Sequence, residues 1–385
     1  MRWFTAGESH GPQLTVIVEG LPAGIEVSSA ELREDLARRQ GGYGRGGRQQ
    51  IETDQARLVG GVRGGVTLGS PVALVLENKD HAHWLADMSP EVESFKPRRP
   101  VTHLRPGHAD LAGALKYGHH DVRNVLERSS ARETAGRVAA GGLARKLLGT
   151  FGMTVFSFTR SIGDVTSREA CLDPAEVDLE SIETSPVRCP DPDASGEMVA
   201  AIDAAKEAGD TLGGTFTVVA AGVPPGLGSH VHWDRKLDGR LAQALISINA
   251  VKAVEFGAGF GGIRRPGSAF HDQIEAREGR FRHLSNRAGG LTGGMSNGEP
   301  IEVTVGIKPI ATLKKPLLSA DLVTKEPVRA HFERSDVCVV PAAGVIGEAM
   351  VALTLADAFL EKFGGDSVPE IRHNLEGYLK DIGWA

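Results

Sequence analysis

Alternating apolar and polar positions recur in short stretches of this chain and predict β-strands. The predicted strands cover residues 13–18, 71–77, 153–159, 215–221 and 301–306. Longer stretches with apolar side chains about one helical turn apart predict helices. The predicted helices cover residues 30–40, 110–118, Ala131–Leu148, Ser195–Ala208, Asp234–Ile248 and Gly344–Phe363, with another near 369–380. Ser28 or Ser29 can cap the first of these helices.

The two kinds of element alternate without a linker, a repeat or a charged tail between them. The stretches that carry candidate chemistry run from residue 7 to residue 336. They can form one site only if the whole length folds together. We therefore expect a single large α+β domain over residues 1–385.

The composition is typical of a globular protein, with 41% hydrophobic and 24% charged residues. No apolar run approaches the ~18 residues of a membrane span, and the first residues, which include Glu8 and His10, lack the apolar segment of a signal peptide. The three cysteines, at positions 171, 189 and 338, are too few and too scattered for a disulfide framework or a metal cage. We expect a cytoplasmic protein with no metal and no membrane partner. The net charge of −6 argues against general nucleic-acid binding.

Glycine and arginine are both abundant, with 49 glycines, and 30 arginines against 13 lysines. Arginine is the preferred bidentate partner of phosphate and carboxylate groups. The bias therefore favours an anionic ligand. A GC-rich genome would produce the same bias, so composition only supports the motifs.

The segment Arg38–Arg48 places Arg38, Arg39, Arg45 and Arg48 at the end of a predicted helix and in the glycine-rich loop after it. Clustered guanidinium groups repel one another unless an anion lies among them, and N–H groups of the loop can bind the same anion. The segment predicts a site for an anionic substrate. The alternative is a solvated basic loop that binds RNA.

Two histidines lie in glycine-containing turns. His10 is part of Gly7–Gly11, just before a predicted strand, and His108 is part of Arg105–Asp110, where a helix can begin. Histidine changes its charge near neutral pH, so both residues are candidate proton carriers. The alternatives are a solvated turn for His10 and a purely structural helix start for His108.

The sequence after residue 127 combines a helix start with positive charge. Ser130 can form a capping box with Glu133. The same helix start, flanked by Arg128 and Arg132, is also suited to bind phosphate. Further segments with candidate chemistry are Gly289–Gly298, Lys308–Thr312 and Arg334–Asp336, of which the last can equally be a simple ion pair.

Together these motifs resemble the chorismate synthase family, nearly from end to end. The matching segments are Gly7–Pro22, Arg38–Arg48, Arg105–Asp110, Glu127–Thr134, Asp234–Phe256, Asn286–Pro300, Lys308–Thr312 and Arg334–Glu348. Residues 160–200 match no pattern of the family. The resemblance implies helices sandwiched between antiparallel β-sheets, in an α+β fold that assembles as a homotetramer.

The resemblance also implies a lyase of the shikimate pathway, which serves aromatic amino acid biosynthesis. Such an enzyme converts 5-enolpyruvylshikimate 3-phosphate to chorismate and phosphate by 1,4-anti-elimination, and it needs reduced FMN without any net redox change. No flavin-reductase insertion is apparent, so we expect an external flavin reductase or another source of reduced FMN. NADPH, which bifunctional members are thought to hold near Arg39 and Arg45, is not expected to suffice.

By the same resemblance, His10 donates a proton to the departing phosphate, His108 protonates the pyrimidine edge of the flavin, and Asp336 relays a proton at flavin N5. The implied substrate-binding residues are Ser9, Arg39, Arg45, Arg48, Arg105 and Arg132. The implied flavin-binding residues are Arg128, Ser129, Ser130, Asn249, Ala250, Gly293, Lys308, Pro309, Ile310, Ala311, Thr312 and Arg334. Ala311 departs from the serine or proline of many members, so a hydroxyl contact at that position would be lost.

Three other functions compete with this interpretation. A phosphotransferase would need a Walker-type loop, which the sequence lacks. An RNA- or phosphoanion-binding protein that uses residues 38–48 would bind with an affinity that falls steeply with salt, and it would retain no flavin. A family member that has lost its activity is the third, and the intact His10, His108 and Asp336 argue against it.

Overall fold

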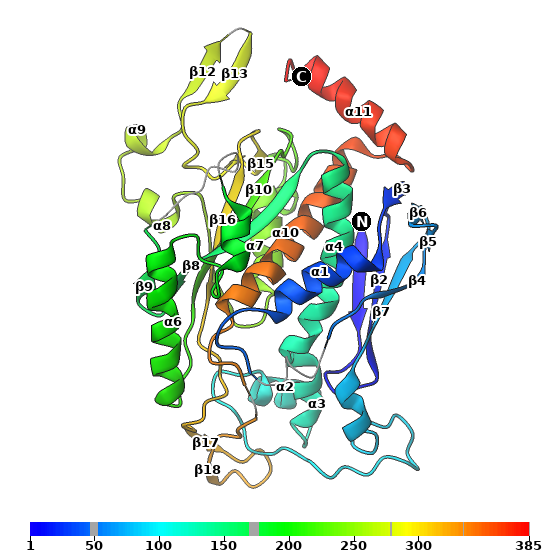
Figure 1. The fold of residues 1–385 in the computed structure, drawn as a ribbon, viewed down its shortest axis with the longest axis vertical. Coiled ribbons are helices and arrows are strands. Elements are labelled where there is room, and N and C mark those ends of the chain that lie inside the picture. The colour runs from blue at the N-terminus through cyan, green and yellow to red at the C-terminus, as the bar shows by residue number, and fades with distance from the viewer. Residues whose placement is uncertain (47–52, 169–176, 278, 334, 385) are drawn as a thin grey trace.

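The computed structural model describes residues 1–385 except 47–52, 169–176, 278, 334 and 385. Its main body consists of two antiparallel sheets with helices between them (Figure 1). One continuous hydrophobic core extends from the first sheet through the helices into the second. The expected α+β fold, with helices sandwiched between antiparallel sheets, is confirmed.

The first sheet has its strands in the order β1-β2-β7-β4. Their bounds are β1 (Arg2–Ala6), β2 (Gln13–Glu19), β7 (Val72–Glu77) and β4 (Arg57–Gly60). On β2, Leu14, Val16 and Val18 are buried while Ile17 is 43% exposed, because alternate side chains of a strand point to opposite faces. One face of this sheet therefore packs on the helices.

The second sheet has its strands in the order β11-β16-β10-β8-β9. Their bounds are β11 (Val251–Phe256), β16 (Ile301–Ile307), β10 (Gly214–Ala221), β8 (Thr154–Ile162) and β9 (Val165–Thr166). Strands β8 and β10 are buried on both faces. Phe156, Phe158 and Val219 form a small outer core with Ile182 of α5 (Leu179–Thr184).

Two long helices form the middle of the sandwich. Helix α4 (Thr134–Thr150) packs on the first sheet, α10 (Val340–Phe363) packs on β8 and β10, and the two helices pack on each other. Helices α1 (Ser29–Gln40) and α7 (Leu237–Ile246) lie against α10 (Figure 1). The close approach of α4 and α10 depends on Gly141, where a Cβ would lie only 2.6 Å from the Cα of Ala349.

Helix α10 is long and apolar enough to cross a membrane by length and composition alone. The prediction that no stretch approaches a membrane span was therefore wrong, because Glu348 and Asp357 interrupt the apolar run without lowering its mean hydropathy enough. Within the fold, 89% of the apolar window of α10 is buried. Such burial is typical of a core helix.

The remaining elements surround this body. They are a three-stranded sheet of β3 (Ala23–Glu26), β6 (Val66–Leu68) and β5 (Val62–Arg63); the hairpins β12 (Ile274–Arg277) with β13 (Arg280–His283), β14 (Leu291–Thr292) with β15 (Met295–Ser296) and β17 (Leu318–Ala320) with β18 (Pro327–Arg329); the helices α2 (Asp110–Tyr117), α3 (Arg123–Ser129), α6 (Pro192–Glu207), α8 (Gly259–Gly262), α9 (Gly267–Phe270) and α11 (Val368–Asp381); and the 3₁₀ helices η2 (Lys79–His83), η3 (Ala131–Glu133) and η4 (Trp233–Arg235).

Most differences from the predicted elements lie at helix starts. Asp191 caps α6, which begins at Pro192 rather than Ser195. The turn η4 takes up the first residues of the helix predicted from Asp234, so α7 begins at Leu237. The predicted cap at Ser28 is confirmed, since its hydroxyl accepts from the Glu31 N–H.

The capping box predicted at Ser130 and Glu133 is wrong in its second half. The Ser130 hydroxyl accepts from the Arg132 N–H, as a cap should. The Glu133 carboxylate instead accepts from Arg137 Nε at 3.0 Å and from the Thr5 hydroxyl at 3.2 Å. The turn η3 therefore replaces the first part of the predicted helix, and α4 starts at Thr134.

Substitution G141A should destabilise the fold by about 1–3 kcal/mol, because the added methyl group forces α4 and α10 apart. A matched control is G149A in the same helix, where the added methyl group would have no heavy atom within 4 Å apart from its chain neighbours and the helix's own backbone. That change should stabilise the fold by up to about 1 kcal/mol through helix propensity. Urea unfolding followed by circular dichroism measures both. Equal midpoints for the two variants would contradict the close approach.

Candidate active site

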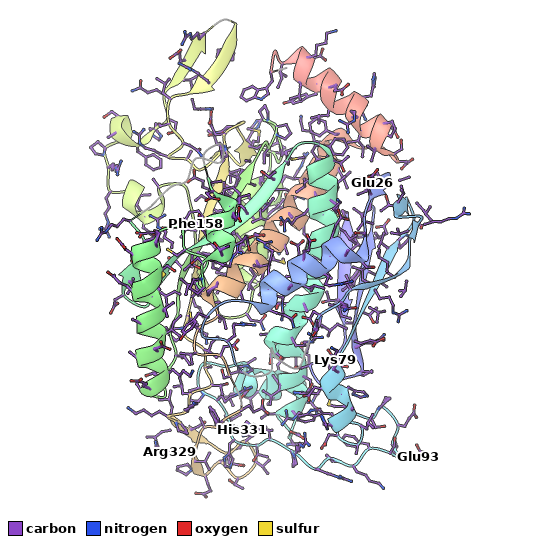
Figure 2. All side chains as sticks on the ribbon, in the orientation of Figure 1. Glu26, Lys79, Glu93, Phe158, Arg329 and His331 are labelled. Carbon is purple, nitrogen blue, oxygen red and sulfur yellow. The ribbon has the colours of Figure 1, made fainter. Side chains whose placement is uncertain are left out.

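A cavity of about 600 Å³ lies where the C-terminal end of α1 and the N-terminal ends of α4 and α10 meet. Figure 2 labels Lys79 and His331 in the lower half of the molecule, and the segments that follow each of them reach the cavity. The cavity is lined by fifteen of the residues predicted for the site: Ser9, His10, Arg39, Arg105, His108, Ser129, Ser130, Arg132, Asn249, Ala250, Lys308, Ile310, Ala311, Thr312 and Asp336.

His10 lies in the turn between β1 and β2 and is held on several sides. Its Nδ1 lies 2.8 Å from Glu127 Oε1, and its backbone N–H donates to Glu127 Oε2 at 2.8 Å. Its ring stacks on Trp84 with a centroid separation of 4.0 Å. Its Nε2 lies 3.9 Å from Asp80 Oδ2. These contacts hold the imidazole on a rigid element at the cavity wall.

Two serines meet beside this histidine. The Ser9 hydroxyl donates to the Ser130 hydroxyl at 3.0 Å, which joins the β1–β2 turn to the start of η3. The backbone N–H of Ser9 also donates to the carbonyl of Glu127 at 2.9 Å. The N-terminal turn is therefore anchored to the segment that precedes α4.

Arg39 and Arg132 are both buried and share one carboxylate, that of Asp54. Arg39 Nη1 lies 3.3 Å from Asp54 Oδ2, and Arg132 Nη1 forms a very short contact with Oδ1. Burial lowers the pKa of Arg39 to about 10 although Asp54 opposes the shift. Two guanidinium groups against one carboxylate leave positive charge at the cavity wall, which suits an anionic ligand.

A second cluster of basic side chains around one carboxylate consists of His108, Arg105 and Asp110. His108 Nδ1 lies 2.5 Å from Asp110 Oδ1, and Arg105 donates from Nε and Nη2 to the two Asp110 oxygens at 2.9 and 3.0 Å. Burial alone would raise the pKa of the Asp110 carboxyl, but hydrogen bonds and positive charge from His108 and Arg105 hold it well below its usual range. Asp110 therefore acts as a fixed anion that orients both neighbours.

Asp336 is bound to the loop that follows α1. Arg45 Nη1 lies 2.8 Å from Asp336 Oδ2, and the Gly46 N–H donates to Oδ1 at 2.6 Å. The buried Nε of Arg45 finds no hydrogen-bond partner among the described residues. The sequence left a simple Arg334–Asp336 ion pair as an alternative, and Arg334 lies outside the described residues.

The segment after β16 forms another part of the cavity wall. Lys308 donates to the carbonyl of Gly107, and its backbone N–H donates to the carbonyl of Ala250 at 3.0 Å. Ala250 has a positive φ of 68°, which turns the backbone sharply at the cavity. Asn249 Nδ2 donates to the carbonyl of Ser129 at 2.8 Å. Burial, with the charge of Lys252, lowers the pKa of Lys308.

Some predicted residues do not line the cavity. Arg128 is 44% exposed and donates to the carbonyls of Thr5 and Gly7. Gly293 lies in the turn between β14 and β15, and Pro309 is exposed. Arg45 reaches the site through its ion pair with Asp336. Arg48 and Arg334 lie outside the described residues.

Sequence reasoning missed the partners of the predicted groups. These are Asp54, Asp80, Trp84, Glu127 and Glu333, of which all but Asp54 and Glu127 line the cavity. Only Glu127 belongs to one of the sequence motifs, where it precedes Arg128 without an assigned role. Of the other four, Asp80 lies in the short 3₁₀ helix η2, and Asp54, Trp84 and Glu333 lie in turns or irregular segments. The position of all four depends on distant parts of the chain.

The comparisons with known proteins agree over the full length. The family model described as chorismate synthase matches residues 1–360. A chorismate synthase of Symbiobacterium thermophilum is 58% identical, with 99% of both chains covered, and one of Desulforudis audaxviator is 57% identical, with 99% of this chain and 98% of the relative covered. A crystal structure of chorismate synthase superimposes with a TM-score of 0.80 and 42% identity, covering 99% of this chain and 98% of the other.

Substitution D54N should destabilise the protein by about 3–5 kcal/mol, because it leaves Arg39 and Arg132 buried without their shared anion. Urea unfolding measures the loss. D203N is a control, since among the described residues Asp203 accepts only a surface hydrogen bond from Tyr43, and its unfolding midpoint should stay close to that of the unchanged protein. A D54N midpoint equal to that of D203N would rule out Asp54 as the anion that holds the pair.

Proposed function

This chain belongs to the chorismate synthase family, and we propose that it forms chorismate by eliminating phosphate from 5-enolpyruvylshikimate 3-phosphate with the help of reduced FMN. Its identity to curated chorismate synthases over nearly its whole length makes it an enzyme of chorismate synthesis in the shikimate pathway. One observation supports the detailed proposal most directly: two histidines and three buried arginines converge on a single cavity.

The arginines supply what a substrate with one phosphate and two carboxylates requires. Arg39, Arg105 and Arg132 are each fixed by a buried carboxylate, so their guanidinium planes are oriented before a ligand arrives. Such preorganised groups lose little conformational freedom on binding. We assign the same role to Arg45, Arg48 and Ser9, as the family resemblance implies.

His10 is our candidate for the proton donor to the leaving phosphate. A general acid must lie on the wall where the leaving group departs, and its proton must face the ligand. His10 meets the first requirement through its place on the cavity wall, between Trp84 and Glu127. Groups of this kind contribute about 10²–10⁴-fold to the rate.

The cavity is compatible with a flavin. Its volume of about 600 Å³ lies within the range of roughly 300–1,000 Å³ found for pockets that bind cofactor-sized molecules. Asn249–Ala250 and Lys308–Thr312 would hold the ring system, together with Ser129 and Ser130. When bound, reduced FMN supplies the electron density that promotes loss of phosphate, with no net redox change.

Two side chains of this protein would each hold a proton beside the flavin. His108, whose Nδ1 faces Asp110, would hold a proton at the pyrimidine edge, and Asp336 would hold one near N5. Arg128, Gly293, Pro309 and Arg334 were also predicted as flavin residues. Of these, Arg128 donates to Thr5 and Gly7, so we propose no flavin contact for it in this arrangement.

We propose that reduced FMN comes from outside the protein, from a flavin reductase or a chemical reductant. Arg39, one of the two residues expected near NADPH, is only 3% exposed and donates to Asp54, Thr134 and the carbonyl of Ala131, which leaves it accessible from the cavity alone. Arg45 is paired with Asp336. The same engagements disfavour an RNA-binding role for the arginine loop.

An anaerobic assay tests the function directly. With 5-enolpyruvylshikimate 3-phosphate and dithionite-reduced FMN, phosphate and chorismate should appear in equal amounts, because each elimination releases one of each. Phosphate release and chorismate absorbance are followed together. Oxidised FMN without reductant is the control and should give neither product.

Two outcomes would contradict parts of the proposal. Turnover with FMN and NADPH alone, with no other reductant, would mean that the protein reduces its own flavin. Tight binding of reduced FMN without any product would mean that the substrate is a different one.

We also propose the homotetramer and the cytoplasmic location that the family implies. The arm from α8 to the hairpin β12–β13 projects from the body (Figure 1) and exposes Phe260, Ile263 and Phe281 by 67%, 69% and 70%. Large apolar side chains exposed on one projecting arm favour an interface. Cys189 and Cys338 are free and buried, which suits a reducing compartment.

Light scattering coupled to gel filtration should give about four times the chain mass of 40.7 kDa. The reason is that a lone chain would leave the apolar arm in water. F281S should lower the mass, whereas V92S, which changes a side chain that is 86% exposed far from the arm in sequence, should not. A mass of one chain for the unchanged protein would refute the assembly.

A further inference from the structure

His10 is tied to one buried carboxylate by two separate hydrogen bonds. The Glu127 side chain, 4% exposed, accepts from the backbone N–H of His10 through Oε2 and from its ring through Oε1, each at 2.8 Å. A carboxylate can only accept hydrogen bonds. Nδ1 of His10 must therefore carry a proton, and Nε2 is the nitrogen left for the cavity.

Glu127 is itself held in place. Arg123 Nη1 lies 3.7 Å from Glu127 Oε1 and 3.0 Å from Glu333 Oε1, and the Arg123 guanidinium lies 5.0 Å from the centre of the Trp84 ring. Trp84 stacks in turn on His10. The carboxylate, the histidine ring and the indole therefore form one packed cluster with little freedom to rotate.

We propose that Glu127 is the positioning residue of the proton donor: it fixes the ring plane of His10 and keeps a proton on Nδ1, so that Nε2, which carries the second proton when the ring acts as the donor, faces the ligand. The inference rests on the proposed role of His10. Glu127 does not line the cavity. It acts through His10 alone, as the buried carboxylate of a catalytic triad acts through its histidine.

A purely structural role for Glu127 is the competing explanation. Glu133 provides the matched control, because it is another nearly buried carboxylate, 9% exposed, on the same stretch of chain. Its oxygens accept from Arg137 and Thr5 rather than from His10. E133Q should therefore lower the free energy of unfolding without altering any contact of His10.

The experiment compares E127Q, E133Q and H10A with the unchanged enzyme in the anaerobic assay. The amide in E127Q offers one acceptor and one donor in place of two acceptors, so it cannot satisfy both N–H groups of His10. We expect kcat of E127Q to fall about 10²-fold, the lower end of what a general acid contributes. KM should stay within about threefold, because substrate binding is not altered. E133Q should keep kcat within about twofold.

Nitrogen-15 NMR of histidine-labelled protein gives a readout that does not depend on turnover. The unchanged enzyme and E133Q should show a hydrogen-bonded Nδ1 proton that is absent in H10A and lost or shifted in E127Q. The absence of this signal from the unchanged enzyme would overturn the inference even if no variant folds.

The kinetic arms separate this inference from the function on which it rests. An E127Q enzyme with normal kcat, alongside an inactive H10A enzyme, would refute the positioning role alone. An H10A enzyme with full kcat would refute the proton-donor role itself, and the role of Glu127 with it.

Discussion

The carboxylate of Glu348, 1% exposed in the middle of α10, organises the centre of the molecule. Both of its oxygens accept from Arg38 of α1 at 2.8 Å, and Oε1 also accepts from Ser157 of β8 and from Arg188. Burial would raise the pKa of this carboxyl, but the surrounding guanidinium charges lower it. Breaking such a buried pair typically costs about 3–5 kcal/mol. Because Arg38 is committed to α10, the helix α1 is fixed in rotation, and the next residue, Arg39, reaches the cavity.

At the cavity, buried carboxylates again hold basic side chains in place, but there each carboxylate is shared by two of them. Asp54 serves both Arg39 and Arg132, and Asp110 serves both Arg105 and His108. Each carboxylate is thus shared between two cationic or potentially cationic groups. The acids hold the bases in fixed orientations while leaving positive charge uncompensated, which is the condition for binding an anion with several charged groups.

The sequence predicted the framework better than it predicted the partners. Strands such as β2 and β16 were found because β-branched residues alternate along them, which is a local property. The Arg38–Arg48 motif by itself could not tell Arg38 from Arg39, and only the family resemblance singled out Arg39. Adjacent residues separate into a structural and a cavity-facing role only once α10 is in place. Glu127 was missed as the partner of His10 for the same reason: their contact joins residues 117 positions apart. The family resemblance assigned Arg128 to the flavin, and in the structure its side chain donates to the carbonyl of Thr5 in β1.

The packing of the two central helices also explains why one site draws on nearly the whole chain. Helices α4 and α10 pack on each other, and Ala131 and Arg132 just before α4, like Val339 just before α10, line the same cavity. Helix N-termini carry partial positive charge and free N–H groups, so the two helix starts add to the field of the arginines. The preference for anions is therefore a property of the helix arrangement as well as of individual side chains. A change deep in the α4–α10 contact, far from any ligand, would move both helix starts relative to His10 and so alter the site without replacing any residue in it.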